Sequence, residues 1–129
     1  MKKPRPLKPT DAELAILRVL WQRGPSTVRE VWEQLGARQQ TGYTTVLKTL
    51  QIMLAKSLVQ RDEADRSHVY RPAIAQEQTQ REFVRHLLER VFAGSARKLV
   101  MQALSVKKAS AAELAEIREL LDELEGGGK

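Results

Sequence analysis

The chain has 129 residues, a formal net charge of +6 and no cysteine. This length allows one domain, or a small domain with an appendage, and the missing cysteine excludes disulfides, thiolate metal sites and cysteine chemistry. No apolar run is long enough to span a bilayer, and the basic start over residues 1–6 lacks the apolar stretch of a signal peptide. We therefore expect a cytoplasmic protein without membrane insertion.

The positive charge is concentrated in the first part of the chain. Residues 1–75 contain 13 Lys and Arg against 7 Asp and Glu, whereas residues 76–129 contain 9 of each kind. No acidic residue lies between Glu33 and Asp62. A surface of this kind attracts a polyanion and releases its counterions. At the two ends we expect a flexible basic arm over residues 1–9 and a disordered tail over residues 126–129.

Two helices are predicted in the first third of the chain. The first begins at Thr10, where Glu13 three residues later completes a capping box, and Gly24 ends it. The second begins near Ser26-Thr27-Val28 and ends at Gly36, and a polar turn is expected to follow it.

A third helix is predicted over residues 43–56. Its apolar positions recur at helical spacing and form one face: Val46, Leu50, Met53 and Leu54. The other side has no carboxylate and carries Thr44, Thr45, Lys48 and Gln51. Small hydroxyl residues allow close approach to base edges, Lys48 can meet a phosphate or a guanine, and Gln51 can pair with adenine. The alternative is an ordinary amphipathic helix with a polar solvent face.

Residues 58–62 and 67–72 predict a β-hairpin, because both runs are short, rich in β-forming residues and bounded by polar turn residues. Three helices and a hairpin in this order predict a winged helix-turn-helix domain over residues 10–75. Its third helix would enter the major groove, and the hairpin would follow the neighbouring backbone. The candidate DNA-binding residues are Tyr43, Thr44, Thr45, Lys48 and Gln51 on the helix and Arg61, Arg66, His68 and Arg71 on the hairpin. The alternative is a protein-binding adaptor whose basic face meets an acidic partner.

Residues 76–125 are predicted to be helical, with a break at Gly94-Ser95 and a last helix that begins with the capping box of Ser110 and Glu113. A region this small rarely encloses a core. We therefore expect it to pack against the same region of a second subunit, giving a homodimer that occupies two half-sites. The candidate dimerisation residues are Leu87, Val91, Leu99, Leu104, Leu114, Ile117, Leu121 and Leu124. The alternative is a monomer whose C-terminal helices fold back on the winged helix. The fold class is then mainly α with a small β-hairpin wing.

Nothing in the sequence indicates an enzyme. His68 and His86 are the only histidines, and neither has a carboxylate or cysteine at ligand spacing. No Gly-rich phosphate loop or Ser-His-Asp set is present. Trp21 and Trp32 lie among Leu and Val at helical spacing, which favours core packing over base stacking. We expect no catalytic residue, no cofactor and no metal.

The stretches Tyr43–Met53, Arg66–Pro72 and Lys98–Leu104 resemble the penicillinase-repressor family of the BlaI, MecI and CopY type. The similarity extends over nearly the whole chain, from Leu7 to Glu125. It implies a bacterial, homodimeric winged-helix transcriptional repressor that binds an inverted-repeat operator on double-stranded DNA and dimerises through its C-terminal helices. In antibiotic-responsive members, a membrane sensor metallopeptidase triggers cleavage of the repressor in that C-terminal part.

Three departures from the family pattern limit what the resemblance implies. The copper-responsive branch has cysteine ligands near the C-terminus, and this chain has none. Ser57 stands where many members end the third helix with Gly, so a non-glycine residue in a left-handed cap is expected. Gln102 and Ala103 stand where cleaved members have an Asn-Phe pair. Induction by cleavage at Gln102-Ala103 and induction by an unidentified ligand or partner therefore both stay open.

Overall fold

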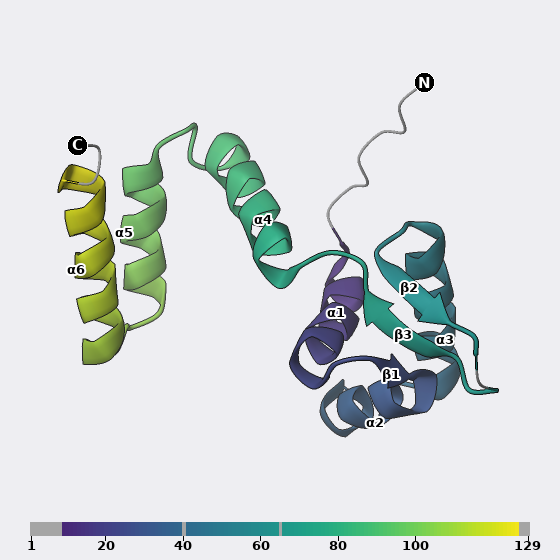
Figure 1. Ribbon diagram of the computed structural model, residues 1–129. Coiled ribbons are helices and arrows are strands. Elements are labelled where there is room, and N and C mark those ends of the chain that lie inside the picture. Colours follow the sequence, from purple (N-terminus) through teal and green to yellow (C-terminus); the bar gives the residue numbers. More distant parts are fainter. Residues whose placement is uncertain (1–8, 40, 65, 127–129) are drawn as a thin grey trace. The chain divides into compact units, whose positions relative to one another are not determined.

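The computed structural model describes residues 9–39, 41–64 and 66–126 (Figure 1). The chain is mainly helical with a small antiparallel sheet, as the sequence predicts. The elements in chain order are α1 (Asp11–Arg23), β1 (Ser26–Thr27), α2 (Val28–Gln39), α3 (Tyr43–Ala55), β2 (Val59–Asp62), β3 (Val69–Pro72), α4 (Gln76–Arg90), α5 (Ala96–Val106) and α6 (Ala111–Gly126). The expected arm and tail lie outside the described residues except for Pro9 and Gly126, the last residue of α6.

The described chain divides into two compact units, and the boundary lies between Val84 and Arg85 within α4. We call the part up to Val84 the winged unit and the part from Arg85 the C-terminal unit. The winged unit contains α1 to α3, the sheet and the first half of α4, and its core is a single apolar cluster. The buried members of this cluster are Ile16, Leu17, Leu20, Val28, Val31, Leu35, Val46, Leu50, Met53, Leu58, Val59 and Tyr70.

The sheet has three strands in the order β1-β3-β2, where the sequence predicts only a two-stranded hairpin. The short β1 pairs antiparallel with β3, and Ser26 lies opposite Tyr70. Ser26 is fully buried and its hydroxyl donates to the carbonyl oxygen of Gly24 at 2.8 Å. The second helix is predicted to begin near Ser26-Thr27-Val28, and it begins at Val28, whereas Ser26 and Thr27 are extended by pairing with a strand far along the chain.

The second helix begins with a capping box that the sequence analysis missed. The Glu30 N–H donates to the Thr27 hydroxyl at 3.2 Å, and the Thr27 N–H donates to a Glu30 carboxylate oxygen at 2.9 Å. The helix does not end at Gly36, as predicted, but continues to Gln39. Glycine weakens a helix by roughly 1 kcal/mol relative to alanine, and ends it only where the backbone turns to positive φ.

Both tryptophans pack against the core of the winged unit, as predicted. The Trp21 Nε1–H donates to the carbonyl oxygen of Ile74 at 3.0 Å, and the Trp32 Nε1–H donates to that of Thr41 at 2.8 Å. The first bond ties the segment after β3 to α1, and the second ties the segment before α3 to α2. Each indole thus satisfies its polar N–H while its ring fills the core.

The C-terminal end of α3 is held by a neighbouring helix. Ser57, directly after the helix cap, has a φ of 66°, so the predicted left-handed residue is present. Lys56 Nζ lies 2.8 Å from Glu13 Oε2, and this ion pair ties the end of α3 to the beginning of α1. Glu13 also completes the predicted capping box with Thr10 and is almost fully buried. Helix α3 is therefore fixed against α1 by a buried carboxylate.

The C-terminal unit is built differently, because α5 and α6 contain no buried residue in a single copy. Helix α4 ends at Arg90, before the predicted break, since Ala93 and Gly94 both have positive φ. Val91, Met101, Leu120 and other large apolar side chains are more than one-third exposed. The helices are therefore formed without a core of their own.

We predict that Glu13 stabilises the winged unit mainly through its charge. Burial raises the pKa of Glu13, but the Lys56 ammonium and the hydrogen bonds from Thr10 outweigh burial and hold this pKa below its ordinary value of 4.5. Because the folded-state pKa is the lower one, the stabilisation is complete above pH 4.5 and is lost as the pH falls through the folded-state pKa. Glu13→Gln should lower the free energy of unfolding by about 1–2 kcal/mol at pH 7 and by less at pH 3.

Urea denaturation followed by tryptophan fluorescence measures this effect in the winged unit alone, since both tryptophans lie there. The control is Glu33→Gln, because the Arg29–Glu33 pair is exposed and 3.7 Å apart. This control should change the free energy of unfolding by less than about 1 kcal/mol. A Glu13→Gln loss that is as large at pH 3 as at pH 7 would contradict the prediction.

Candidate nucleic-acid interface

Helix α3 packs against the rest of the winged unit by one face. Val46, Leu50 and Met53 are fully buried, whereas Thr44, Thr45 and Lys48 are exposed. Gln51 is exposed as well. None of the last four forms a side-chain hydrogen bond or ion pair with another residue in the described ranges. Four polar side chains are therefore available to a partner outside the chain.

The N-terminus of α3 is open. Its N-cap is Gly42, which has no side chain to accept a hydrogen bond, and the first turn contains no acidic residue. In contrast, α1 begins with a Thr–Glu capping box and α6 with a Ser–Glu pair. Uncapped N–H groups and the positive end of the helix dipole favour an anion at this position.

Aromatic and cationic side chains set the position of this N-terminus. The rings of Trp32 and Tyr43 meet edge to face, with centroids 5.9 Å apart and planes at 78°. The Arg29 guanidinium lies over the Trp32 ring, 5.8 Å from its centroid. Tyr43, which is 42% exposed, is thus held by packing and still reaches the surface.

The wing presents its two faces to different surroundings. Arg61 pairs with the buried Tyr70 across the strands, whereas Arg71 pairs with Gln60 on the other face. Arg61 donates to the Tyr70 hydroxyl at 3.4 Å and forms an ion pair with Glu63. These two contacts raise the pKa of Arg61, so its charge is largely matched inside the wing.

The other wing cations are less engaged. Arg71 donates only to the neutral Gln60 amide oxygen, at 3.1 Å. Arg66 and His68 are exposed, and neither side chain has a hydrogen bond or ion pair with another described residue. Of the four predicted wing residues, Arg61 is therefore paired within the wing. Arg66, His68 and Arg71 keep polar or charged groups that a partner could contact.

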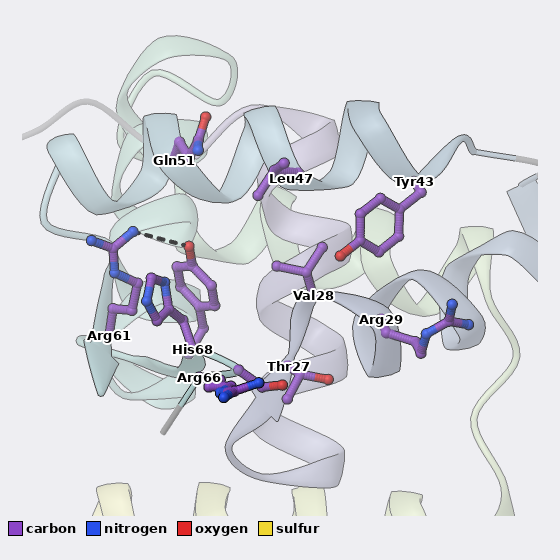
Figure 2. A pocket seen from close by; sticks show the side chains of 11 residues that line it. Thr27, Val28, Arg29, Tyr43, Leu47, Gln51, Arg61, Arg66 and His68 are labelled. Carbon is purple, nitrogen blue, oxygen red and sulfur yellow. Dashed lines mark hydrogen bonds between the residues drawn. The ribbon is translucent and has the colours of Figure 1, made fainter. Parts of the chain in front are cut away.

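A cleft of about 530 Å³ lies between α3, the beginning of α2 and the wing (Figure 2). It brings together five of the nine predicted DNA-binding residues: Tyr43, Gln51, Arg61, Arg66 and His68. Thr44, Thr45, Lys48 and Arg71 are exposed but do not line it. The lining also contains residues that the sequence analysis did not single out: Thr27, Val28, Arg29, Leu47, Ser67 and Tyr70.

Arg29 is the most informative of these missed residues. It lies in the first turn of α2, and its side chain appears beside the cleft together with Thr27 (Figure 2). The Thr27–Glu30 capping box was the available sequence signal, since it places Arg29 in the first turn of a helix. Backbone and side-chain groups at such helix beginnings commonly contact phosphates in protein–DNA complexes.

The predicted dimerisation residues fall into two groups in the single copy. Leu99, Leu114 and Ile117 are half-buried within the C-terminal unit. The others are exposed: Leu87, Val91, Leu104, Leu121 and Leu124. Gln102 and Ala103 are exposed in the middle of the continuous helix α5.

Two features are absent from the described residues. No group of three or more His, Asp or Glu side chains in this part of the chain could hold a metal ion. None of its helices combines the length and apolar character that crossing a membrane requires.

Comparison with known proteins gives one family match and two relatives that agree with it. The family model described as "Penicillinase repressor" matches residues 9–123. Two relatives, from Mycobacterium tuberculosis strains CDC 1551 and H37Rv, are both named "Transcriptional regulator BlaI". Each is 34% identical over 118 residues, which cover 91% of this chain and 85% of the relative.

We predict that the two cleft arginines of the wing contribute differently to binding of random duplex DNA. Arg66→Ala should weaken binding and reduce the slope of log K against log salt by about 1, as expected for one lost phosphate contact. The matched variant Arg61→Ala should change this slope less, since Glu63 already balances the Arg61 charge. Fluorescence anisotropy with a labelled duplex at several salt concentrations measures both slopes. Equal slopes for Arg66→Ala and the wild type would show that this part of the wing does not contact the backbone.

Proposed function

Because this chain belongs to the penicillinase repressor family, we propose that it represses transcription by binding a specific operator on double-stranded DNA in the cytoplasm. The family consists of transcriptional regulators, not enzymes. The observation that carries the proposal is the solvent-facing row of α3, where unpaired hydroxyl, ammonium and amide groups stand on a helix anchored by its opposite face. A rigid helix with free polar groups is the form in which proteins present side chains to base edges.

The arrangement of this row supports base reading. Thr44, Lys48 and Gln51 follow one another at spacings of four and three residues, so they lie along one side of the helix. Thr45 stands beside this row. Lysine can donate to guanine, glutamine can form two bonds with adenine, and a threonine methyl can meet the thymine methyl group.

The surroundings of α3 support backbone contacts. The open N-terminus of the helix favours a phosphate, and Arg66, His68 and Arg71 on the wing are available for the neighbouring strand. Arg29, whose ion pair with Glu33 is exposed and 3.7 Å long, adds a cation from α2 on the other side of the cleft. These contacts would fix the register of the helix in the major groove without reading sequence.

We propose in addition that the repressor is a homodimer on an inverted-repeat operator. The support is the C-terminal unit, whose large apolar side chains are uncovered in a single copy. A second copy could cover them with the same surface, since a two-fold interface is self-complementary. Two linked winged units would then occupy two half-sites, and the second binding event would become intramolecular.

Release from the operator by a sensor metallopeptidase is the family-based proposal for induction. Cleavage at Gln102-Ala103 would separate the winged unit from α6 and remove the gain from joining two half-sites. Since both residues lie inside a continuous helix, α5 must open locally before a peptidase can bind the chain in extended form.

We predict that Thr45 contacts a base and that Lys48 contacts a base or a phosphate. Once selection from a random DNA pool has supplied the operator, Thr45→Ala should weaken operator binding by roughly 1–3 kcal/mol with little effect on random DNA. Lys48→Ala should weaken binding to both if it contacts phosphate. Gln22→Ala, which alters an exposed residue of α1, is the control. Equal losses on operator and random DNA for both α3 variants would remove the base-reading proposal.

A further inference from the structure

The wing carries as many acidic residues as arginines. Residues 58–72, which include the wing, contain three of each: Arg61, Arg66, Arg71, Asp62, Glu63 and Asp65. A segment that lies beside a DNA backbone gains from cations and loses from carboxylates, because phosphates attract the first and repel the second. The carboxylates of the wing therefore serve a purpose other than attraction to DNA.

Asp62 and Glu63 make different contacts. Asp62 Oδ1 accepts the Ala64 N–H at 3.0 Å, so this carboxylate closes the turn of the wing. The Glu63 carboxylate makes no such turn contact, and within the described part of the chain it meets only Arg61. The Arg61 Nε–H donates to Glu63 Oε2 at 2.7 Å, and Arg61 Nη2 forms an ion pair with the same oxygen. Glu63 therefore acts on a cation and not on the backbone of the turn.

Arg61 lines the cleft beside α3, whereas Glu63 does not. The described residues that line this cleft include Arg29, Arg61 and Arg66 but no carboxylate. Arg61 Nη1 reaches the hydroxyl of Tyr70, which also lines the cleft (Figure 2). The charge that balances Arg61 therefore comes from the turn of the wing and not from the cleft.

The ion pair leaves Arg61 able to donate hydrogen bonds but balances its charge. A guanidinium has five N–H groups. Glu63 engages two of them, and Tyr70 a third at 3.4 Å, so two remain for another acceptor. Counterion release depends on charge instead, because a cation already paired with a carboxylate neutralises no phosphate. Arg61 can thus touch a DNA backbone without adding to its electrostatic attraction.

We propose that Glu63 is a positioning residue that holds Arg61 within the wing and withholds the Arg61 charge from DNA. Its carboxylate occupies the place on the guanidinium that a phosphate would otherwise take. The pair lies at the surface, with the Glu63 side chain 54% exposed, so it contributes little to the stability of the wing. Glu63 thus lowers the affinity of the protein for any duplex. This inference rests on the proposed DNA binding and adds a residue that limits its strength.

Glu63→Gln in the full chain tests the inference, because glutamine keeps an acceptor for Arg61 but carries no charge. Asp62→Asn is the matched control, since it removes one charge from the same turn and keeps the acceptor for the Ala64 N–H. Fluorescence anisotropy with a labelled random duplex at several salt concentrations measures binding. Glu63→Gln should bind about threefold more tightly and steepen the slope of log K against log salt by about 1. Asp62→Asn should change the slope by less than half as much.

Arg61→Ala identifies the cation that is released. In the wild type it should leave the slope nearly unchanged, and in the Glu63→Gln background it should remove the whole increase. Equal slopes for Glu63→Gln and the wild type would overturn the inference, and so would equal increases for Glu63→Gln and Asp62→Asn. A loss of slope that Arg61→Ala causes equally in both backgrounds would also overturn it. Far-UV circular dichroism checks that each variant is folded.

Elution from immobilised heparin separates failure of the inference from failure of the proposed function. A wild type that binds no duplex DNA would contradict the proposed function. Heparin is a polyanion without bases, so Glu63→Gln should elute from it at higher salt than the wild type and Asp62→Asn whether or not an operator exists. Elution of all three proteins at the same salt concentration would overturn the inference by itself.

Discussion

Helices α5 and α6 contain no fully buried residue in a single copy, and even Leu99, Leu114 and Ile117 are only half-buried. The winged unit has a complete apolar cluster and satisfies its two indoles internally. The C-terminal unit has formed helices whose large apolar side chains face solvent. Apolar side chains stabilise a structure only when they are removed from water. A second surface would cover these side chains, and we propose that a second copy of the chain supplies it.

The winged unit and the C-terminal unit differ in how firmly their helices are held within one copy. The winged unit holds α3 rigidly, through buried side chains on one face and through the Glu13–Lys56 ion pair at its end. Base reading requires such rigidity, because a helix that shifted by an ångström would lose its hydrogen bonds. The C-terminal unit has no comparable anchor within one copy, which suits a role in joining two reading helices.

Features encoded by neighbouring residues could be predicted from the sequence. The capping boxes at Thr10 and Ser110 and the apolar face of α3 each depend on residues three or four positions apart. The strand β1 could not be predicted, because Ser26 is extended only through its pairing with Tyr70. The helix end at Gly36 was wrong for a related reason, since a glycine ends a helix through backbone conformation, which its identity alone does not specify.

The candidate site, too, could be predicted from the sequence only where it depends on neighbouring residues. The polar row of α3 follows from helical periodicity, and the structure leaves it exposed. Arg61 and Arg66 have different surroundings because of the strand register and the contact between Arg61 and Tyr70. Residue type alone does not distinguish the two arginines. Arg29 was missed because its place at the cleft arises from the packing of α2 against α3 and the wing. Residue type therefore predicted the exposed polar row of α3, and tertiary contacts decide which cations lie beside it.

Sedimentation velocity of the full chain at micromolar concentration tests the proposed homodimer most directly. We expect the wild type to sediment as a dimer, and Leu121→Lys with Leu124→Lys, which charges two exposed leucines of α6, to sediment as a monomer. Unchanged tryptophan fluorescence would confirm that the winged unit of the variant is folded. A wild type that sediments as a monomer would contradict the homodimer.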